Sequence, residues 1–190
     1  EFRWKARNKQ KPTHNKPEWK GDPLNGRSLL LYTEQGFGDT IMFLRFAQQM
    51  SRADNRISLQ CQTQLKRLFS AQSELEYVVA NGEKLPNYDL QAPLMSLPHL
   101  LKLTRENNLH SQAYLSPDEL SIAPIPEAKP GHKKVAIAWT SAPHSEIREK
   151  KTVPYSKFSK LFNTPNCTFY SVQINADATA ITDMESQEAS

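Results

Sequence analysis

The sequence predicts an α/β protein built on parallel strands. Short apolar runs of strand length alternate with segments whose apolar residues recur at helical spacing. A turn with two glycines, residues 34–39, stands where the first apolar run gives way to the first helical segment. A proline-rich stretch, residues 116–131, separates two such series. Strands that alternate with helices pair in parallel through right-handed crossovers.

The first element is expected over residues 27–33, a continuous apolar run typical of a parallel strand covered on both faces. A helix is expected over residues 39–52, in which Met42 and Phe46 recur at helical spacing and Arg45 supplies a polar side. Strands follow over residues 56–61, 76–80 and 88–93, and helical segments over 63–71 and 94–103, the last interrupted at Pro98. After the prolines, strands are expected over 134–140 and 167–173, with a helix over 155–162.

This pattern predicts four parts. They are a basic linker over residues 1–26, an α/β domain over 27–115, a proline-rich linker over 116–131 and the beginning of a second α/β domain over 132–190. Trp19 is expected to anchor the linker on the first domain, because an exposed lone tryptophan is unusual. The chain starts with Glu and stops without a terminating element, so we expect it to be part of something longer.

Composition narrows the classes of function. The chain has 190 residues and a net charge of +4, and no apolar run approaches the roughly 20 residues that span a bilayer. The basic residues of the first linker are scattered among Asn, Gln and Pro, which favours a solvated linker over a nucleic-acid site. Cys61 and Cys167 lie far apart within apolar segments, as expected for buried reduced thiols in a cytoplasmic protein. The histidines lack metal-ligand spacing.

The glycine turn (residues 34–39) fits neither common phosphate-binding motif. Gly36 and Gly38 could be the first two glycines of a dinucleotide fingerprint, but the third position is Ile41, and no acid ends the second strand. A P-loop would need Gly-Lys-Ser/Thr. What remains is a turn that presents Asp39 where parallel strands end, the edge at which ligands bind in open α/β sheets. Asp39 either caps the helix or has a chemical role.

Residues 17–46, PEWKGDPLNGRSLLLYTEQGFGDTIMFLRF, resemble the entry segment of bacterial glycosyltransferase-like domains that follow tetratricopeptide repeats. These domains are related to the heptosyltransferases and have the GT-B architecture of two Rossmann-like domains. The matching residues are Trp19, Gly21, Glu34, Gln35, Gly36, Gly38, Asp39 and Arg45. The segments YDLQAPLMSLP and KVAIAWTSAPHSEIREKKTVP resemble later parts of the same family more weakly.

The resemblance implies an incomplete GT-B protein whose intact parent transfers a sugar from a nucleotide sugar, with inversion, to a hydroxyl of a glycan, lipid or protein acceptor, without metal or other cofactor. Asp39 would be the catalytic base. Glu34, Gln35, Gly36 and Gly38 would contact the acceptor, and Arg148, Lys150 and Lys151 the donor diphosphate. Without the rest of a donor domain, the 190-residue chain alone is expected to be inactive and to associate with itself or with a partner chain.

The second-domain loop departs from the family pattern. Thr140, Ser141 and Ala142 replace the customary Gly-Asn, and Lys151-Thr152 replaces Arg-Ser. These changes favour an alternative, in which the chain is a non-catalytic binding or assembly module derived from a glycosyltransferase.

Overall fold

The structure is a computed structural model that describes residues 14–51, 55–104, 113–116, 124–140, 152–153, 157 and 159–173. The chain divides into two compact units, Glu1–Ile122 and Ala123–Ser190. Each unit contains a sheet in which every strand pair is parallel. This arrangement confirms the α/β class predicted from the sequence.

The sheet of the first unit has the order β3-β2-β1-β4. Its strands are β1 (Leu29–Tyr32), β2 (Ile57–Cys61), β3 (Tyr77–Ala80) and β4 (Leu90–Pro93). The first three strands follow one another across the sheet, and β4 returns to the other side of β1, which is the beginning of the Rossmann order. The edge of β4 is extended by the preceding linker, because the Trp19 N–H donates to the Gln91 carbonyl at 2.8 Å and the Gln91 N–H to the Pro17 carbonyl at 3.0 Å. Trp19 is buried, as its anchoring role predicts.

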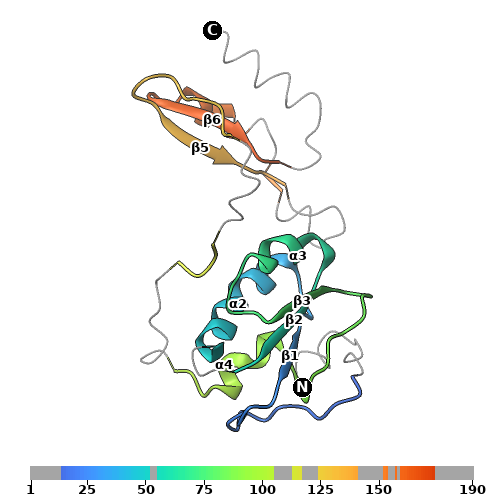
Figure 1. Ribbon diagram of the computed structural model, residues 1–190. Helices are drawn as coiled ribbons and strands as arrows, with labels where there is room; N and C mark the ends of the chain where they lie inside the picture. The colour runs from blue at the N-terminus through green and yellow to red at the C-terminus, as the bar shows by residue number, and fades with distance from the viewer. Residues whose placement is uncertain are drawn as a thin grey trace. The chain divides into compact units, whose positions relative to one another are not determined.

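Three helices cover one face of this sheet (Figure 1). They are α2 (Phe37–Ser51), α3 (Thr63–Ser70) and α4 (Leu97–Leu100), with the 3₁₀ turn η1 (Leu94–Ser96) before α4. Their apolar residues form one core with alternate residues of β1, since Leu29 and Leu31 belong to this cluster and Leu30 does not. The core also contains Leu44, Phe46, Ala47 and Met50 of α2, Leu65 and Phe69 of α3, and Leu94 and Leu97 at α4.

Three details differ from the sequence expectation. The helix α2 begins at Phe37 rather than at residue 39, because the Gly36 carbonyl already accepts the N–H of Thr40 at 3.1 Å. Pro98 lies in the first turn of α4 and does not interrupt it, since the proline lacks an N–H that would have no partner there. Met42 is 47% exposed and does not share the buried face of Phe46.

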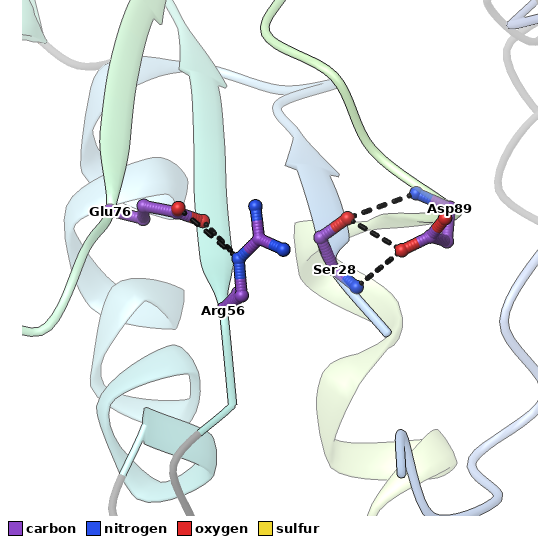
Figure 2. A network of polar contacts seen from close by, with 4 residues as sticks. All are labelled: Ser28, Arg56, Glu76 and Asp89. Atoms are coloured by element: carbon purple, nitrogen blue, oxygen red, sulfur yellow. Dashed lines mark hydrogen bonds and ion pairs between the residues drawn. The ribbon is translucent and has the colours of Figure 1, made fainter. Parts of the chain in front are cut away.

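At the amino edge of the sheet, where the amino ends of its strands lie, polar side chains pair with one another (Figure 2). Asp89, just before β4, accepts hydrogen bonds from the N–H and the hydroxyl of Ser28, both at 2.8 Å. Arg56 and Glu76, just before β2 and β3, pair at 3.2 Å. The first pair links the starts of β1 and β4, and the second pair links the starts of β2 and β3.

The second unit contains β5 (Lys133–Ile137), the 3₁₀ helix η3 (Ser159–Asn163) and β6 (Cys167–Ser171). Of the helix expected over residues 155–162, residue 157 is α-helical and residues 159–162 belong to the 3₁₀ helix. Ile137 and Trp139 are buried against Phe162 and Phe169, so Trp139 is a packing residue. The side chain of Gln173 accepts the N–H groups of Trp139 and Thr140 at 3.0 and 2.8 Å.

Both cysteines are free thiols, with Cys61 buried and Cys167 half-buried. Burial raises the pKa of the Cys61 thiol to about 11. Within the described ranges, no helix has the length and apolar character needed to cross a membrane.

Candidate functional site

The glycine turn lies at the carboxyl edge of the first sheet, between the end of β1 at Tyr32 and the start of α2 at Phe37. The chain leaves β1 toward β2 on one side, whereas β4 lies on the other side of β1. This is the point at which the strand order reverses. Open α/β sheets bind their ligands outside the carboxyl ends of the strands at such a point. The fold therefore places the glycine turn at the position where a ligand is expected.

Gln62, the residue after β2, holds the glycine turn in place. Its side-chain amide donates to the Gln35 carbonyl at 2.7 Å and to the Thr40 hydroxyl at 3.0 Å. The Thr40 hydroxyl lies 3.1 Å from the Gly36 carbonyl, to which it can donate because it accepts from Gln62. The network joins the turn after β1 to the end of β2.

Sequence reasoning missed this role of Gln62 and noted only that an acid was absent there. The available signal was the position of Gln62. A polar residue that follows the neighbouring parallel strand lies at the same edge as the glycine turn.

Asp39 occupies the third position of α2, and Gly36 occupies the cap position. The Asp39 side chain is half-buried. A Cβ added to Gly36 would lie 3.7 Å from Asp39 Oδ2, so the carboxylate turns back toward the start of the helix. Among the residues with described placement, the Asp39 carboxylate has no hydrogen bond or ion pair. Asp39 is thus not the N-cap residue, although a negative charge in the first turn still complements the helix dipole.

The fold does not require glycine at residue 36 or at residue 38. Of the six glycines in the chain, Gly21, Gly26, Gly82 and Gly131 have positive φ, which favours glycine. Gly36 and Gly38 do not. A Cβ at Gly38 would meet no atom within 4 Å, and at Gly36 only the flexible Asp39 carboxylate. Glycine inside a helix costs about 0.5–1 kcal/mol relative to alanine. The bare backbone therefore leaves space in front of the turn at some cost to stability.

The other predicted acceptor residues also lie at this edge. Glu34 and Gln35 are half-buried, and both carboxylate oxygens of Glu34 are shielded from solvent. Gln35 is engaged through its main-chain carbonyl, by Gln62. The predicted donor-binding residues Arg148, Lys150 and Lys151 lie outside the described residues.

His14 lies beside the last residue of β1. Its ring and that of Tyr32 are 4.6 Å apart between centroids. Burial lowers the pKa of His14, which favours the neutral form of this imidazole. A histidine of the linker thus contributes to the surroundings of the carboxyl edge, which its sequence position did not suggest.

A hollow of about 350 Å³ opens at the opposite, amino edge of the sheet. Its lining includes Trp19, Gly21, Met50 and one carboxylate, Asp22. Asp22 is paired with Arg27 at 2.7 Å, which lowers its pKa. The hollow therefore offers no free acid or base, and we place the candidate site at the carboxyl edge. The part of the chain that the structure describes contains no group of three or more metal-binding side chains.

Comparison with known proteins identifies one distant similarity. The chain is 25% identical to Protein FlbA of Caulobacter vibrioides over 177 aligned residues, which cover 82% of this chain. The chain spans 30% of the length of that relative. No protein-family model matches the chain, and no solved structure matches it.

Proposed function

We propose that the chain is the acceptor-side domain, with part of the donor-side domain, of a GT-B glycosyltransferase-like protein related to the heptosyltransferases and associated with tetratricopeptide repeats. The whole protein would act in the cytoplasm on a nucleotide sugar and an acceptor hydroxyl. The observation that supports this proposal is the glycine turn. It presents a half-buried Asp39, which has no partner among the described residues, at the reversal point of a Rossmann-like sheet and beside two glycines that the fold does not require.

In the proposed reaction, the Asp39 carboxylate takes the proton of the acceptor hydroxyl. The hydroxyl oxygen forms a bond to the anomeric carbon of the donor from the face opposite the leaving group. The bond from that carbon to the diphosphate oxygen breaks, and the nucleoside diphosphate leaves with the electron pair. The base has to be near the hydroxyl but not already neutralised by a partner, which agrees with the absence of a hydrogen bond to Asp39 in the described part.

The test is release of nucleoside diphosphate from uridine, guanosine and adenosine diphosphate sugars by the full-length protein, with water or added sugar as acceptor. Asp39→Asn keeps the size of the side chain and removes the base, so the rate is expected to fall by about 10²–10⁴-fold. Glu74→Gln is the matched control, because Glu74 is a half-buried carboxylate between α3 and β3 at the amino edge. Its rate should equal that of the wild type.

Two results would contradict the catalytic proposal. One is an Asp39→Asn variant that releases nucleoside diphosphate as fast as the Glu74→Gln control. The other is a folded full-length protein that releases none from any donor. The second result would favour the alternative, a non-catalytic binding or assembly module that keeps the sheet of a glycosyltransferase.

A further inference from the structure

Residues 113–116, the last described residues of the first unit, dock on its helices. The Arg45 guanidinium lies 4.7 Å from the centroid of the Tyr114 ring, and the side-chain amide of Gln48 donates to the Tyr114 carbonyl. Arg45 and Gln48 are three positions apart and so lie on one face of α2. Leu115 packs against the apolar core of the unit. The helix α2 therefore holds both the side chain and the main chain of Tyr114.

Gln72, which follows α3, holds the end of this docked segment. Its side-chain oxygen accepts the Ser116 N–H at 2.9 Å, and its amide nitrogen donates to the Ser116 carbonyl at 3.0 Å. A residue of a neighbouring β-strand makes the same pair of hydrogen bonds to its partner. Gln72 is only 3% exposed, and its amide nitrogen also donates to the Leu68 carbonyl at 2.8 Å. Docking of Ser116 thus gives this buried amide the partners that it needs.

The second unit holds the other end of the same connection. The Tyr170 hydroxyl of β6 donates to the Pro126 carbonyl at 2.8 Å, across 44 positions of sequence. Lys134 of β5 lies 3.5 Å from the Glu127 carboxylate, but this ion pair is exposed and contributes little. The connection is therefore docked at both ends, on α2 and α3 of the first unit and on β6 of the second.

The contacts of the docked segment are of a kind that can form and release. Ordering an extended segment costs conformational entropy. Here the cost is offset by hydrogen bonds, one cation–π contact and the partial burial of Leu115, since Tyr114 and Leu115 are half-buried and Ser116 is exposed. No fully buried side chain of residues 113–116 fixes the segment to the core.

We propose that the linker between the two units has a short, docked form and a long, released form. With both ends docked, it runs from Ser116 to Pro126 and reaches at most about 35 Å, whatever conformation it adopts. With both ends released, it runs from Leu103, after α4, to the start of β5 at Lys133 and reaches at most about 100 Å. A shorter linker raises the effective concentration of one unit around the other. The inference does not depend on the proposed function, because it concerns the separation of the units and not the reaction.

The first experiment measures this separation. Spin labels are attached through Ser73→Cys and Lys129→Cys, at exposed positions near the two docked ends, and Cys167→Ala removes the half-buried native thiol. Pulsed electron paramagnetic resonance of the 190-residue chain then gives the distribution of distances between the labels. Dilution with unlabelled chain removes any distance between two copies.

Releasing the docked segment should lengthen the mean distance. The double variant Gln48→Ala, Gln72→Ala removes the side-chain amides and should raise the mean by about 5–10 Å, as expected for a flexible linker that gains the released residues. The matched control is Gln49→Ala with Gln60→Ala, which truncates two half-buried glutamines whose side chains make no hydrogen bond within the described residues. Its distances should equal those of the wild type.

A second variant removes one contact without disturbing α3. Ser116→Pro deletes the N–H that Gln72 accepts and keeps the hydrogen bond between Gln72 and Leu68, so the mean distance should again rise. Ala113→Pro is the control, because the Ala113 N–H donates no hydrogen bond within the described part of the chain. Hydrogen exchange should show protection of the Ser116 amide in the wild type and its loss in the double glutamine variant.

The end on the second unit is tested by Tyr170→Phe, which deletes the hydroxyl and keeps the ring. The amide signals of residues 125 and 127 should shift, whereas Tyr77→Phe, at an exposed ring of the first unit, should leave them unchanged.

Three results would overturn the proposal. The first is a mean distance that is the same in the wild type, the double glutamine variant and Ser116→Pro. The second is Tyr170→Phe with unshifted signals at residues 125 and 127, since the short form needs both ends. The third is loss of the short distances on dilution with unlabelled chain, which would show that the segment docks on a second copy.

Discussion

Replacing Gln62 by alanine should loosen the glycine turn while leaving the sheet intact. The variant removes two hydrogen bonds, one to the Gln35 carbonyl and one to the Thr40 hydroxyl. Thr40 is 2% exposed, so water cannot easily take the place of the amide. At about 1 kcal/mol for each bond, with a further penalty for a buried group left unpaired, the loss should be about 1–3 kcal/mol. For a domain of this size, each kcal/mol lowers Tm by about 4–8 °C.

The matched control is Gln60→Ala, which truncates the same type of side chain two residues earlier in β2. Gln60 is half-buried, and within the described residues its side chain makes no hydrogen bond. Chemical denaturation gives the free energy of unfolding of each variant, and amide hydrogen exchange at Thr40 reports the local effect. Equal losses for Gln62→Ala and Gln60→Ala, with unchanged exchange at Thr40, would show that Gln62 does not hold the turn.

Gln62→Glu tests the direction of the same hydrogen bonds. It keeps the shape of the side chain and its one oxygen but replaces the NH₂ group, with its two N–H donors, by a second oxygen, so at neutral pH a carboxylate would face the Gln35 carbonyl. We expect a loss of stability at least as large as that of Gln62→Ala, and smaller at low pH, where the protonated acid regains one donor. A Gln62→Glu variant as stable as the wild type at pH 7 would mean that the amide nitrogen does not donate to Gln35.

Three further predictions concern stability and thiol chemistry. Gly21→Ala should lower the free energy of unfolding more than Gly82→Ala. Both glycines have positive φ, but only at Gly21 would a Cβ lie 2.4 Å from a main-chain oxygen, that of Leu100 in α4. Gly82→Ala, with no atom near the added Cβ, should cost about 1–2 kcal/mol. Hydrogen bonds from Ser28 lower the pKa of Asp89 below its usual 3.8. The stabilisation of the folded state by these bonds is therefore complete above pH 3.8 and is lost as the pH falls below it. Denaturation curves of wild type and Asp89→Asn should converge in acid and differ at pH 7. The Cys61 thiol, with its pKa of about 11, should react with a disulfide reagent at pH 8 only after unfolding.

The sequence predicted the elements of the first unit well because their signals are local. Continuous apolar runs bounded by glycine, proline or asparagine predict buried parallel strands, and β1, β2 and β4 fall within the expected ranges. The position of the glycine turn followed from the same pattern, since a turn after a parallel strand has to lie at the carboxyl edge.

The contacts of the site could not be predicted from the sequence because they depend on register. Gln62 meets Gln35 across 27 positions of sequence, and the meeting requires β1 and β2 to pair as they do. The start of α2 was misplaced because aspartate is a common cap and glycine a weaker signal. The exposure of Phe37 was not predicted, because an apolar residue beside a helical pattern indicates packing. Its exposed side chain follows only from the three-dimensional structure.

The two edges of the first sheet use their polar residues differently, and this difference bears on function. At the amino edge, Ser28 with Asp89 and Arg56 with Glu76 satisfy one another (Figure 2). At the carboxyl edge, Gln62 satisfies only the main chain and Thr40, and the Asp39 carboxylate is left without a partner in the described residues. A chain under selection for stability alone would gain from pairing that carboxylate and from alanine in place of the helix glycine at residue 38. At the carboxyl edge, therefore, the Asp39 carboxylate and the glycine at residue 38 do not serve the stability of the fold. A group of this kind is expected at a site that binds or reacts with a ligand.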